Sequence, residues 1–190
     1  MAGGRSSRFG GFPKGTLKRP DGQRVVDHLL RIMAEAGVPQ RVIVANDPQT
    51  YSDQVCPVIP DLRPGMGPLG GIEAALTHFR ESHDAVFFLP CDLPGLGTAQ
   101  LKAVLQTYRQ TGERLVVAET GLSRMEPLCS VVDVKLLDEI ALSVSKGSLS
   151  VNALWRQLAA HAVRFEDPAP FCNVNREEDW NAWRRDKTGA

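Results

Sequence analysis

The apolar run at residues 85–89 constrains the fold of this chain more than any other stretch. Its five consecutive apolar side chains are typical of a strand that is buried on both faces of a sheet. The next residues, 90–94, read Pro-Cys-Asp-Leu-Pro, and the two prolines fix the backbone around Asp92 and end the strand. Such a strand requires helices on both faces of its sheet, so the run predicts an α/β protein.

Strand-like and helix-like patterns alternate along the rest of the 190 residues. Short apolar runs indicate strands, and apolar residues at helical spacing indicate helices. The expected helices cover residues 25–36, 72–81, 98–111, 133–142, 148–158 and 177–185, and the expected strands cover residues 41–46, 55–59, 84–90, 114–119, 126–132 and 161–165. We therefore expect a single three-layer domain over residues 1–190, with a mostly parallel, Rossmann-like sheet between helices.

The composition argues against several classes of protein. Lysine plus arginine and aspartate plus glutamate both number 22, so the zero net charge gives no global attraction to nucleic acid or to an anionic membrane. The apolar runs are too short to span a bilayer, and the first residues lack the apolar region of a signal peptide. The four cysteines lack the spacing of a zinc site. We expect a cytoplasmic protein that binds neither nucleic acid nor membranes.

Residues 1–14 form a second unusual stretch, with four glycines and three cationic side chains. Glycine lets backbone N–H groups approach a ligand closely, and arginine and lysine complement the charge of phosphate. A loop of this composition that leads toward a helix can hold a polyphosphate. A basic N-terminal tail without fixed structure explains the same composition, and this stretch alone does not decide between the two interpretations.

Polar residues follow three of the expected strands, namely Asn46, Asp61 and Asp92. In open α/β sheets ligands bind outside the carboxyl ends of the strands, where these side chains would lie. A carboxylate fixed at position 92 suits Mg²⁺, which takes one or two protein carboxylates and leaves other positions to phosphates and water. Lys14, at the end of the glycine-rich stretch, would neutralise a phosphoryl group. Taken singly, each of these residues is also explained as a turn former or a surface charge.

Four motifs occur in order along the chain. Residues 2–14 read A-G-G-R-S-S-R-F-G-G-F-P-K, residues 67–71 read G-P-L-G-G, residues 90–94 read P-C-D-L-P, and residues 171–179 read F-C-N-V-N-R-E-E-D. Each motif is weak alone, but together they resemble the motifs of the MobA-like nucleotidyltransferases. Within that family, the cysteine in P-C-D-L-P is similar to the motif of the molybdenum cofactor guanylyltransferase branch. The resemblance covers essentially the whole chain. It implies the nucleotide-diphospho-sugar transferase type of α/β fold.

The resemblance also implies an activity and a site. The reaction would be Mg²⁺-dependent transfer of GMP from GTP to molybdopterin, giving the guanine dinucleotide cofactor and pyrophosphate. The residues implied to bind GTP are Met1, Ala2, Gly3, Gly4, Lys14, Asn46, Asp61 and Asp92. Lys14, Asp92 and Arg8 would be catalytic, with Asp92 as the metal ligand, and Asn173 and Asn175 would border the pterin. Other cofactor-biosynthesis proteins and molybdoenzyme chaperones would be the protein partners.

Three alternatives stay open at this point. Two of them are related enzymes, namely a cytidylyltransferase that acts on the same pterin and a MobA-like protein with another acceptor. A protein of a different class, a carrier that binds the nucleotide or the pterin without catalysis, would need many of the same residues.

One departure from the family pattern concerns the start of the chain. In the family a strand precedes the glycine-rich loop, whereas here Met1 stands where a leucine of that strand is expected. The strand is central in the fold, so a chain without it would leave neighbouring backbone groups unpaired in the core. We therefore expect the fold to lack its first strand. Either translation starts farther upstream, or the chain is less stable and impaired.

Overall fold

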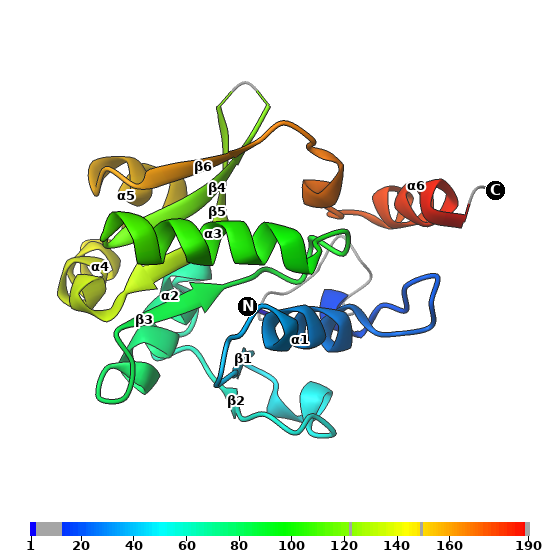
Figure 1. The fold of residues 1–190 in the computed structure, drawn as a ribbon. Coiled ribbons are helices and arrows are strands. Elements are labelled where there is room, and N and C mark those ends of the chain that lie inside the picture. Colours follow the sequence, from blue (N-terminus) through cyan, green and yellow to red (C-terminus); the bar gives the residue numbers. More distant parts are fainter. Residues whose placement is uncertain (3–12, 122, 149, 189–190) are drawn as a thin grey trace.

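The computed structural model describes residues 1–2, 13–121, 123–148 and 150–188. Strands lie between layers of helices in Figure 1, which confirms the predicted α/β class. The helices are α1 (Val25–Glu35), α2 (Gly67–Phe79), α3 (Thr98–Thr111), α4 (Leu137–Ser145), α5 (Val151–Gln157) and α6 (Glu177–Thr188), with short 3₁₀ helices η2 (Lys14–Thr16), η3 (Pro48–Tyr51), η4 (Val134–Leu136) and η5 (Ala169–Phe171). The strands are β1 (Ile43–Val44), β2 (Val58–Ile59), β3 (Ala85–Phe88), β4 (Leu115–Thr120), β5 (Arg124–Asp133) and β6 (His161–Phe165).

The start of α2 differs from the predicted start at residue 72. The helix begins at Gly67, because a proline is tolerated in the first turn and Pro68 occupies that turn. Gly71 lies where α2 packs against the β1–β2 pair, and a Cβ on it would lie 3.1 Å from both a Val44 methyl carbon and Asp61 Oδ1. The glycine-rich segment is therefore part of the helix, and its small residues permit this close approach.

The strands form two sheets. β1 and β2 make a parallel pair, and the larger sheet has the order β3-β5-β4-β6. β6 runs parallel to β4, whereas β5 runs antiparallel to both β3 and β4. Three of these four strands share one direction, but the expectation of a mostly parallel sheet did not foresee the reversal of β5. Residues 121–123 are the whole connection between β4 and β5, and so short a connection permits only an antiparallel pair.

Two hydrophobic cores lie on opposite faces of the larger sheet. Phe87 of β3 packs into the core that α1, α3 and α6 cover, whereas Val86 and Phe88 pack into the core that α2, α4 and α5 cover. This alternation follows from the period of two along a strand. Because both faces are covered, the strand is apolar throughout, as its sequence predicted.

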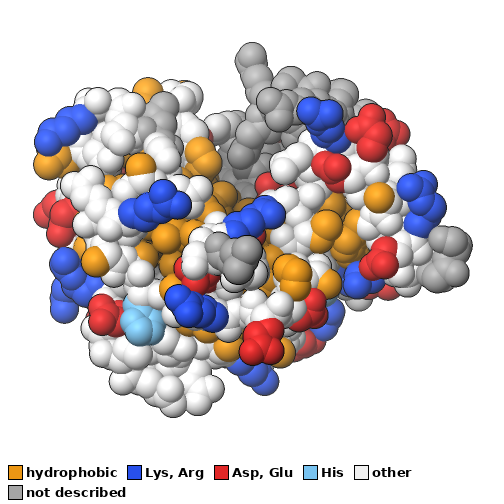
Figure 2. All heavy atoms as spheres, turned by 90° about the horizontal axis from the view of Figure 1, so that it is seen from above, with side chains coloured by type: hydrophobic (Ala, Val, Ile, Leu, Met, Phe, Trp, Pro, Cys, Tyr) orange, Lys and Arg blue, Asp and Glu red, His pale blue; other side chains and the backbone are white. Residues whose placement is uncertain are grey.

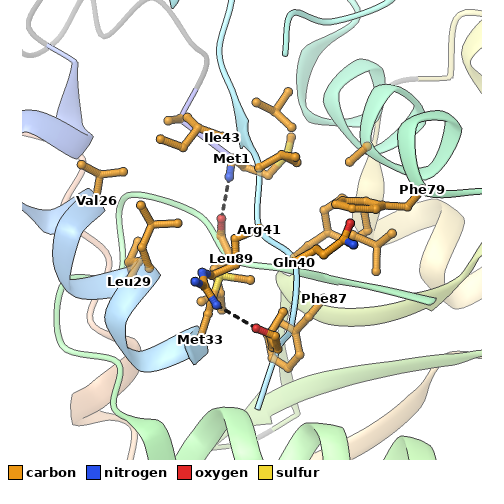
Figure 3. Close-up of a pocket in the computed structure, with 18 of the residues that line it drawn as sticks. Met1, Val26, Leu29, Met33, Gln40, Arg41, Ile43, Phe79, Phe87 and Leu89 are labelled. Carbon is orange, nitrogen blue, oxygen red and sulfur yellow. Dashed lines mark hydrogen bonds between the residues drawn. The ribbon is translucent and has the colours of Figure 1, made fainter. Parts of the chain in front are cut away.

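Met1 and Ala2 lie between the two sheets. The amino group of Met1 donates to the carbonyl oxygen of Leu89 at 2.8 Å (Figure 3), and the Met1 carbonyl accepts from the N–H of Cys91 at 3.2 Å. The N–H of Ala2 donates to the carbonyl oxygen of Val44 at 2.9 Å. The two bonds of Met1 follow the pattern of a parallel ladder. The first two residues therefore connect β1 to the end of β3 through the main chain.

An apolar groove continues from Met1 between β1 and β3. Its walls include Leu29 and Met33 of α1, Phe79 of α2 and Phe87 of β3 (Figure 3). Among the described residues β1 and β3 are edge strands of their sheets, and residues of both line the groove. The cavity volume is about 90 Å³, and the lining is mostly apolar, so the groove is too small for a nucleoside triphosphate.

His28 on α1 holds the loop that follows Asp92. Its Nε2 lies 2.7 Å from the carbonyl oxygen of Leu96, and Arg31 donates to its Nδ1 at 3.1 Å. An arginine can only donate, so Nδ1 accepts and the neutral ring carries its proton on Nε2. Burial lowers the pKa of His28 below its ordinary value. Arg19 and Arg31 lower it further, while the Leu96 carbonyl and Asp21 oppose the shift.

We expect an apolar strand in the groove to stabilise the protein. A segment of about five residues rich in valine and isoleucine, fused directly before Met1, should raise the melting temperature by about 5 °C, because it pairs with two open strand edges and buries apolar surface. A fused segment of equal length with proline at alternate positions lacks the N–H groups for pairing and is the matched control. Equal melting temperatures for the two fusions, measured by differential scanning calorimetry, would contradict this expectation.

We also expect mild acid to destabilise the protein through His28. Its folded-state pKa is depressed, so the stabilisation by the neutral ring is complete above the unfolded pKa of about 6.5 and is lost as the pH falls through the folded pKa. The melting temperature should therefore fall between about pH 7 and about pH 5. In His28→Gln, which keeps a donor toward Leu96 but cannot titrate, the fall should be shallower.

The control for this experiment is His78→Gln, because His78 is exposed. This variant should keep the pH dependence of the unaltered protein. If His28→Gln and His78→Gln melt with the same pH profile, His28 does not carry the acid sensitivity.

Candidate functional site

Three polar side chains from distant parts of the sequence meet beyond the end of β3. Lys14 opens η2, Asp92 follows β3, and Asn175 precedes α6. Lys14 Nζ donates to Asn175 Oδ1 at 2.9 Å and lies 3.8 Å from Asp92 Oδ2. The structure thus brings together three of the residues that the sequence analysis named.

The backbone on both sides of Asp92 is held in place. The N–H of Cys91 donates to the Met1 carbonyl at 3.2 Å, and the carbonyl of Asp92 accepts from the N–H of Val174 at 2.9 Å. Leu93, directly after Asp92, is fully buried in the core under α1 and α3. These contacts hold the backbone that carries the Asp92 carboxylate, whose side chain is 28% exposed.

The electrostatic surroundings of Asp92 favour a cation. Burial raises the pKa of Asp92 above its ordinary value, although the positive charges of Lys14 and the Met1 amino group pull it down. The negative charge at this position is therefore only partly compensated. Among the described residues no group of three or more His, Cys, Asp and Glu side chains could hold a metal ion. A metal at Asp92 would need other ligands, such as phosphate oxygens and water.

Asn46 and Asp61 form a second polar group beyond β1 and β2. Asn46 Nδ2 donates to Asp61 Oδ2 at 2.8 Å, and the N–H of Asp61 donates to Asn46 Oδ1 at 3.0 Å. Parallel pairing of β1 with β2 brings the two residues together, because the strand ends then share one edge. Asp61 Oδ1 also lies close to Gly71, where the missing side chain leaves room at the start of α2.

Met1 lies between the two polar groups. Its main chain bonds to Leu89 and Cys91 beside Asp92, and its side chain reaches Gly71 beside Asp61. The predicted site residues Gly3, Gly4 and Arg8 lie outside the described residues. The part of the predicted site that the structure describes is therefore continuous around Met1 and Ala2.

The sequence analysis did not identify Glu126 as a site residue. Glu126 lies on β5, is 6% exposed and accepts a hydrogen bond from Asn173 Nδ2 through Oε2 at 3.4 Å. Burial raises its pKa, and the negative charge of Asp92 adds to this effect. A glutamate inside an ordinary strand pattern gives no signal of function, and only its burial in the fold makes it unusual.

Charges on the surface are mixed. On the face shown in Figure 2, acidic and basic side chains alternate over the coloured part of the molecule. None of the helices that the structure describes is long and apolar enough to cross a membrane.

Comparison with known protein families identifies the chain. The MobA-like NTP transferase domain matches residues 1–163. The chain belongs to the MobA-like NTP transferase family. It is therefore a nucleotidyltransferase, as the resemblance of its motifs implied.

Bacterial relatives are similar along most of the chain. A protein of Vibrio cholerae named molybdenum cofactor guanylyltransferase is 31% identical over 181 residues, which cover 94% of this chain and 86% of the relative. A Yersinia pestis protein with the same name is 30% identical over an alignment of 195 positions that covers 100% of this chain and 95% of the relative.

Solved structures show the same fold. The molybdopterin-guanine dinucleotide biosynthesis protein A of Archaeoglobus fulgidus superposes with a TM-score of 0.78 at 19% identity and covers 100% of this chain and 97% of its own. A nucleotidyl transferase of Methanothermobacter superposes with a TM-score of 0.74 at 19% identity, with coverage of 99% and 95%. These likenesses confirm the predicted type of α/β fold.

Proposed function

We propose that this MobA-like protein transfers GMP from GTP to molybdopterin, giving the molybdopterin guanine dinucleotide cofactor and pyrophosphate. The names of its relatives in Vibrio and Yersinia support the reaction. The observation in the fold that carries the proposal is the convergence of Lys14, Asp92 and Asn175. A cation, a carboxylate and an amide at one point can hold phosphate, a metal ion and a polar acceptor together.

In this proposal Lys14 and Asp92 act on the phosphates. Lys14 would contact the phosphoryl oxygens and neutralise charge that develops in the transition state. Asp92 would hold Mg²⁺, and its half-buried carboxylate with partly compensated charge fits such an ion. When bound, the ion would supply positive charge to the triphosphate. Arg8 would add a further positive charge.

The nucleoside would bind at the second polar group. Asn46 and Asp61 hold each other through two hydrogen bonds, so their remaining oxygen and N–H positions have fixed directions toward a base or a ribose. The backbone at Met1, Ala2, Gly3 and Gly4 would bind GTP, with Ala2, Gly3 and Gly4 on its phosphates. In this arrangement GTP would extend from Asn46 and Asp61 toward Asp92.

The acceptor would bind on the side of Asn173 and Asn175. Its nucleophile is a phosphate that is already anionic, so the protein needs no general base to activate it. Positioning and charge neutralisation would supply most of the rate enhancement. Other cofactor-biosynthesis proteins and molybdoenzyme chaperones are the protein partners that we propose, with the cytoplasm as the location.

The choice of nucleotide tests the guanylyl assignment. With molybdopterin as acceptor, GTP should support pyrophosphate release at least about tenfold faster than CTP, because a difference of about 1.4 kcal/mol in transition-state binding suffices for that ratio. Pyrophosphate is measured with each nucleotide in turn, and reactions without molybdopterin serve as controls. Turnover with CTP alone would replace the proposed activity with cytidylyl transfer.

A second experiment separates an enzyme from a carrier. Asp92→Asn should lower kcat by about 100-fold or more, since it removes the charge that holds the metal, while the circular dichroism spectrum stays unchanged. The matched control is Asp138→Asn, because Asp138 is exposed on α4, and it should keep full activity. A carrier would still deliver its cofactor to an apoenzyme after Asp92→Asn, and that outcome would refute catalysis by this chain.

A further inference from the structure

A bulge in β5 directs the buried Glu126. Val117 of β4 pairs with Ser130, but the next residue, Ala118, pairs with Glu126, so residues 127–129 have no partner on β4. The bulge is held by Trp155, whose Nε1 donates to the Pro127 carbonyl at 2.9 Å. Bulges next to active sites commonly redirect a side chain, and this one is fixed by a fully buried tryptophan.

The charge of the buried Glu126 carboxylate is only partly compensated, because burial raises its pKa although Arg124 and side-chain hydrogen bonds with Asn173 and Thr120 lower it. Oε2 accepts from Asn173 Nδ2 at 3.4 Å. Arg124 Nε lies 3.1 Å from Oε1, but without hydrogen-bond geometry, so Oε1 has no hydrogen-bond partner among the described residues. The Arg124 side chain is itself 64% exposed and compensates the charge incompletely. A buried carboxylate in such surroundings costs stability, which marks it as a candidate functional group.

Glu126 determines how the amide of Asn173 faces. In the structure the amide turns its NH₂ group toward Glu126 Oε2, which accepts from it at 3.4 Å, as a carboxylate oxygen without a proton must. The reversed amide would place its carbonyl oxygen against a carboxylate oxygen, and the two would repel. Asn173 Oδ1 is therefore the atom left to accept a hydrogen bond from another molecule.

Asn173 belongs to a segment that contacts both charged residues of the site. The next residue, Val174, donates its N–H to the carbonyl of Asp92 at 2.9 Å, and Asn175 Oδ1 accepts from Lys14 Nζ at 2.9 Å. A molecule that approaches Lys14 and Asp92 along this segment would meet the Asn173 amide. The orientation of that amide then decides whether the protein presents a hydrogen-bond acceptor or a hydrogen-bond donor to this molecule.

We propose that Glu126 is a positioning residue for the acceptor substrate. It holds the Asn173 amide with the carbonyl oxygen free to accept from an N–H group of the acceptor, a class of group that a pterin ring carries. This inference rests on the proposed function, because it assigns the Asn173 side of the site to the acceptor. To the proposed function it adds one residue, Glu126, and one feature of the acceptor that this residue selects, an N–H group.

The test is a double-mutant cycle between Glu126 and Asn173. Glu126→Gln keeps the size of the side chain but can donate as well as accept, so Asn173 is no longer fixed. The Kd of molybdopterin, measured from its fluorescence under anaerobic conditions, should rise about tenfold, as expected for loss of one oriented hydrogen bond near a charged group. The KM for GTP should stay unchanged, and the melting temperature should not fall, because the substitution removes a buried charge. In an Asn173→Ala background Glu126→Gln should have no further effect.

Glu119→Gln is the matched control, because Glu119 lies on the adjacent strand β4 and is paired with Arg164 at 2.9 Å. It should leave the Kd of molybdopterin unchanged. An unchanged Kd in Glu126→Gln would overturn the inference, as would an effect of the same size with Asn173→Ala present. Loss of GTP binding along with the pterin would show a merely structural role.

The same measurements keep the two proposals apart. If the unaltered protein binds molybdopterin but releases no pyrophosphate with any nucleotide, the proposed function fails, while the Kd values still decide the role of Glu126. If the unaltered protein turns over GTP and Glu126→Gln has the same Kd, only the role of Glu126 fails. If the unaltered protein does not bind molybdopterin, both fail.

Discussion

Three main-chain hydrogen bonds made by Met1 and Ala2 hold this site together. They connect the end of β3, which Asp92 follows, to β1, which the Asn46–Asp61 pair follows. The neighbouring groove between these strands is apolar and has strand edges along both sides. These few hydrogen bonds therefore join the two sheets through the main chain. The spacing of the two polar groups depends on this short connection.

Burial gives the charged residues of the site their chemical character. Asp92 follows a strand that is covered on both faces, so its carboxylate lies at the edge of a region of low dielectric constant, with Lys14 as its main compensation. The same surroundings make Glu126 costly for stability. Such charges are tolerated because the backbone around them is held firmly, by Val174 beside Asp92 and by the bulge beside Glu126. Rigid backbone and partly compensated charge are the features that preorganised catalysis requires.

Local patterns were sufficient to predict much of the fold. The apolar run at residues 85–89 appears as β3, α1 and α3 begin where their periodicity indicated, and β6 has the predicted bounds. The start of α2 was missed because glycine and proline weaken a helical pattern, although tight packing against Val44 and Asp61 favours them there. The direction of β5 was missed because strand periodicity is the same in parallel and antiparallel ladders. The short connection at residues 121–123 was the available signal.

The sequence by itself determined the α/β class, the family through its four ordered motifs, and the candidates Lys14, Asp92, Asn46 and Asp61, because these depend on residue type and local spacing. The tertiary structure alone decided which of the candidate residues lie together. Lys14 meets Asn175 across 161 positions of sequence, and Asn46 pairs with Asp61. The tertiary structure alone identified Glu126 as a candidate, because its burial and its partner on another segment result from packing. Sequence spacing carries no information about contacts between segments that only the folded core brings together.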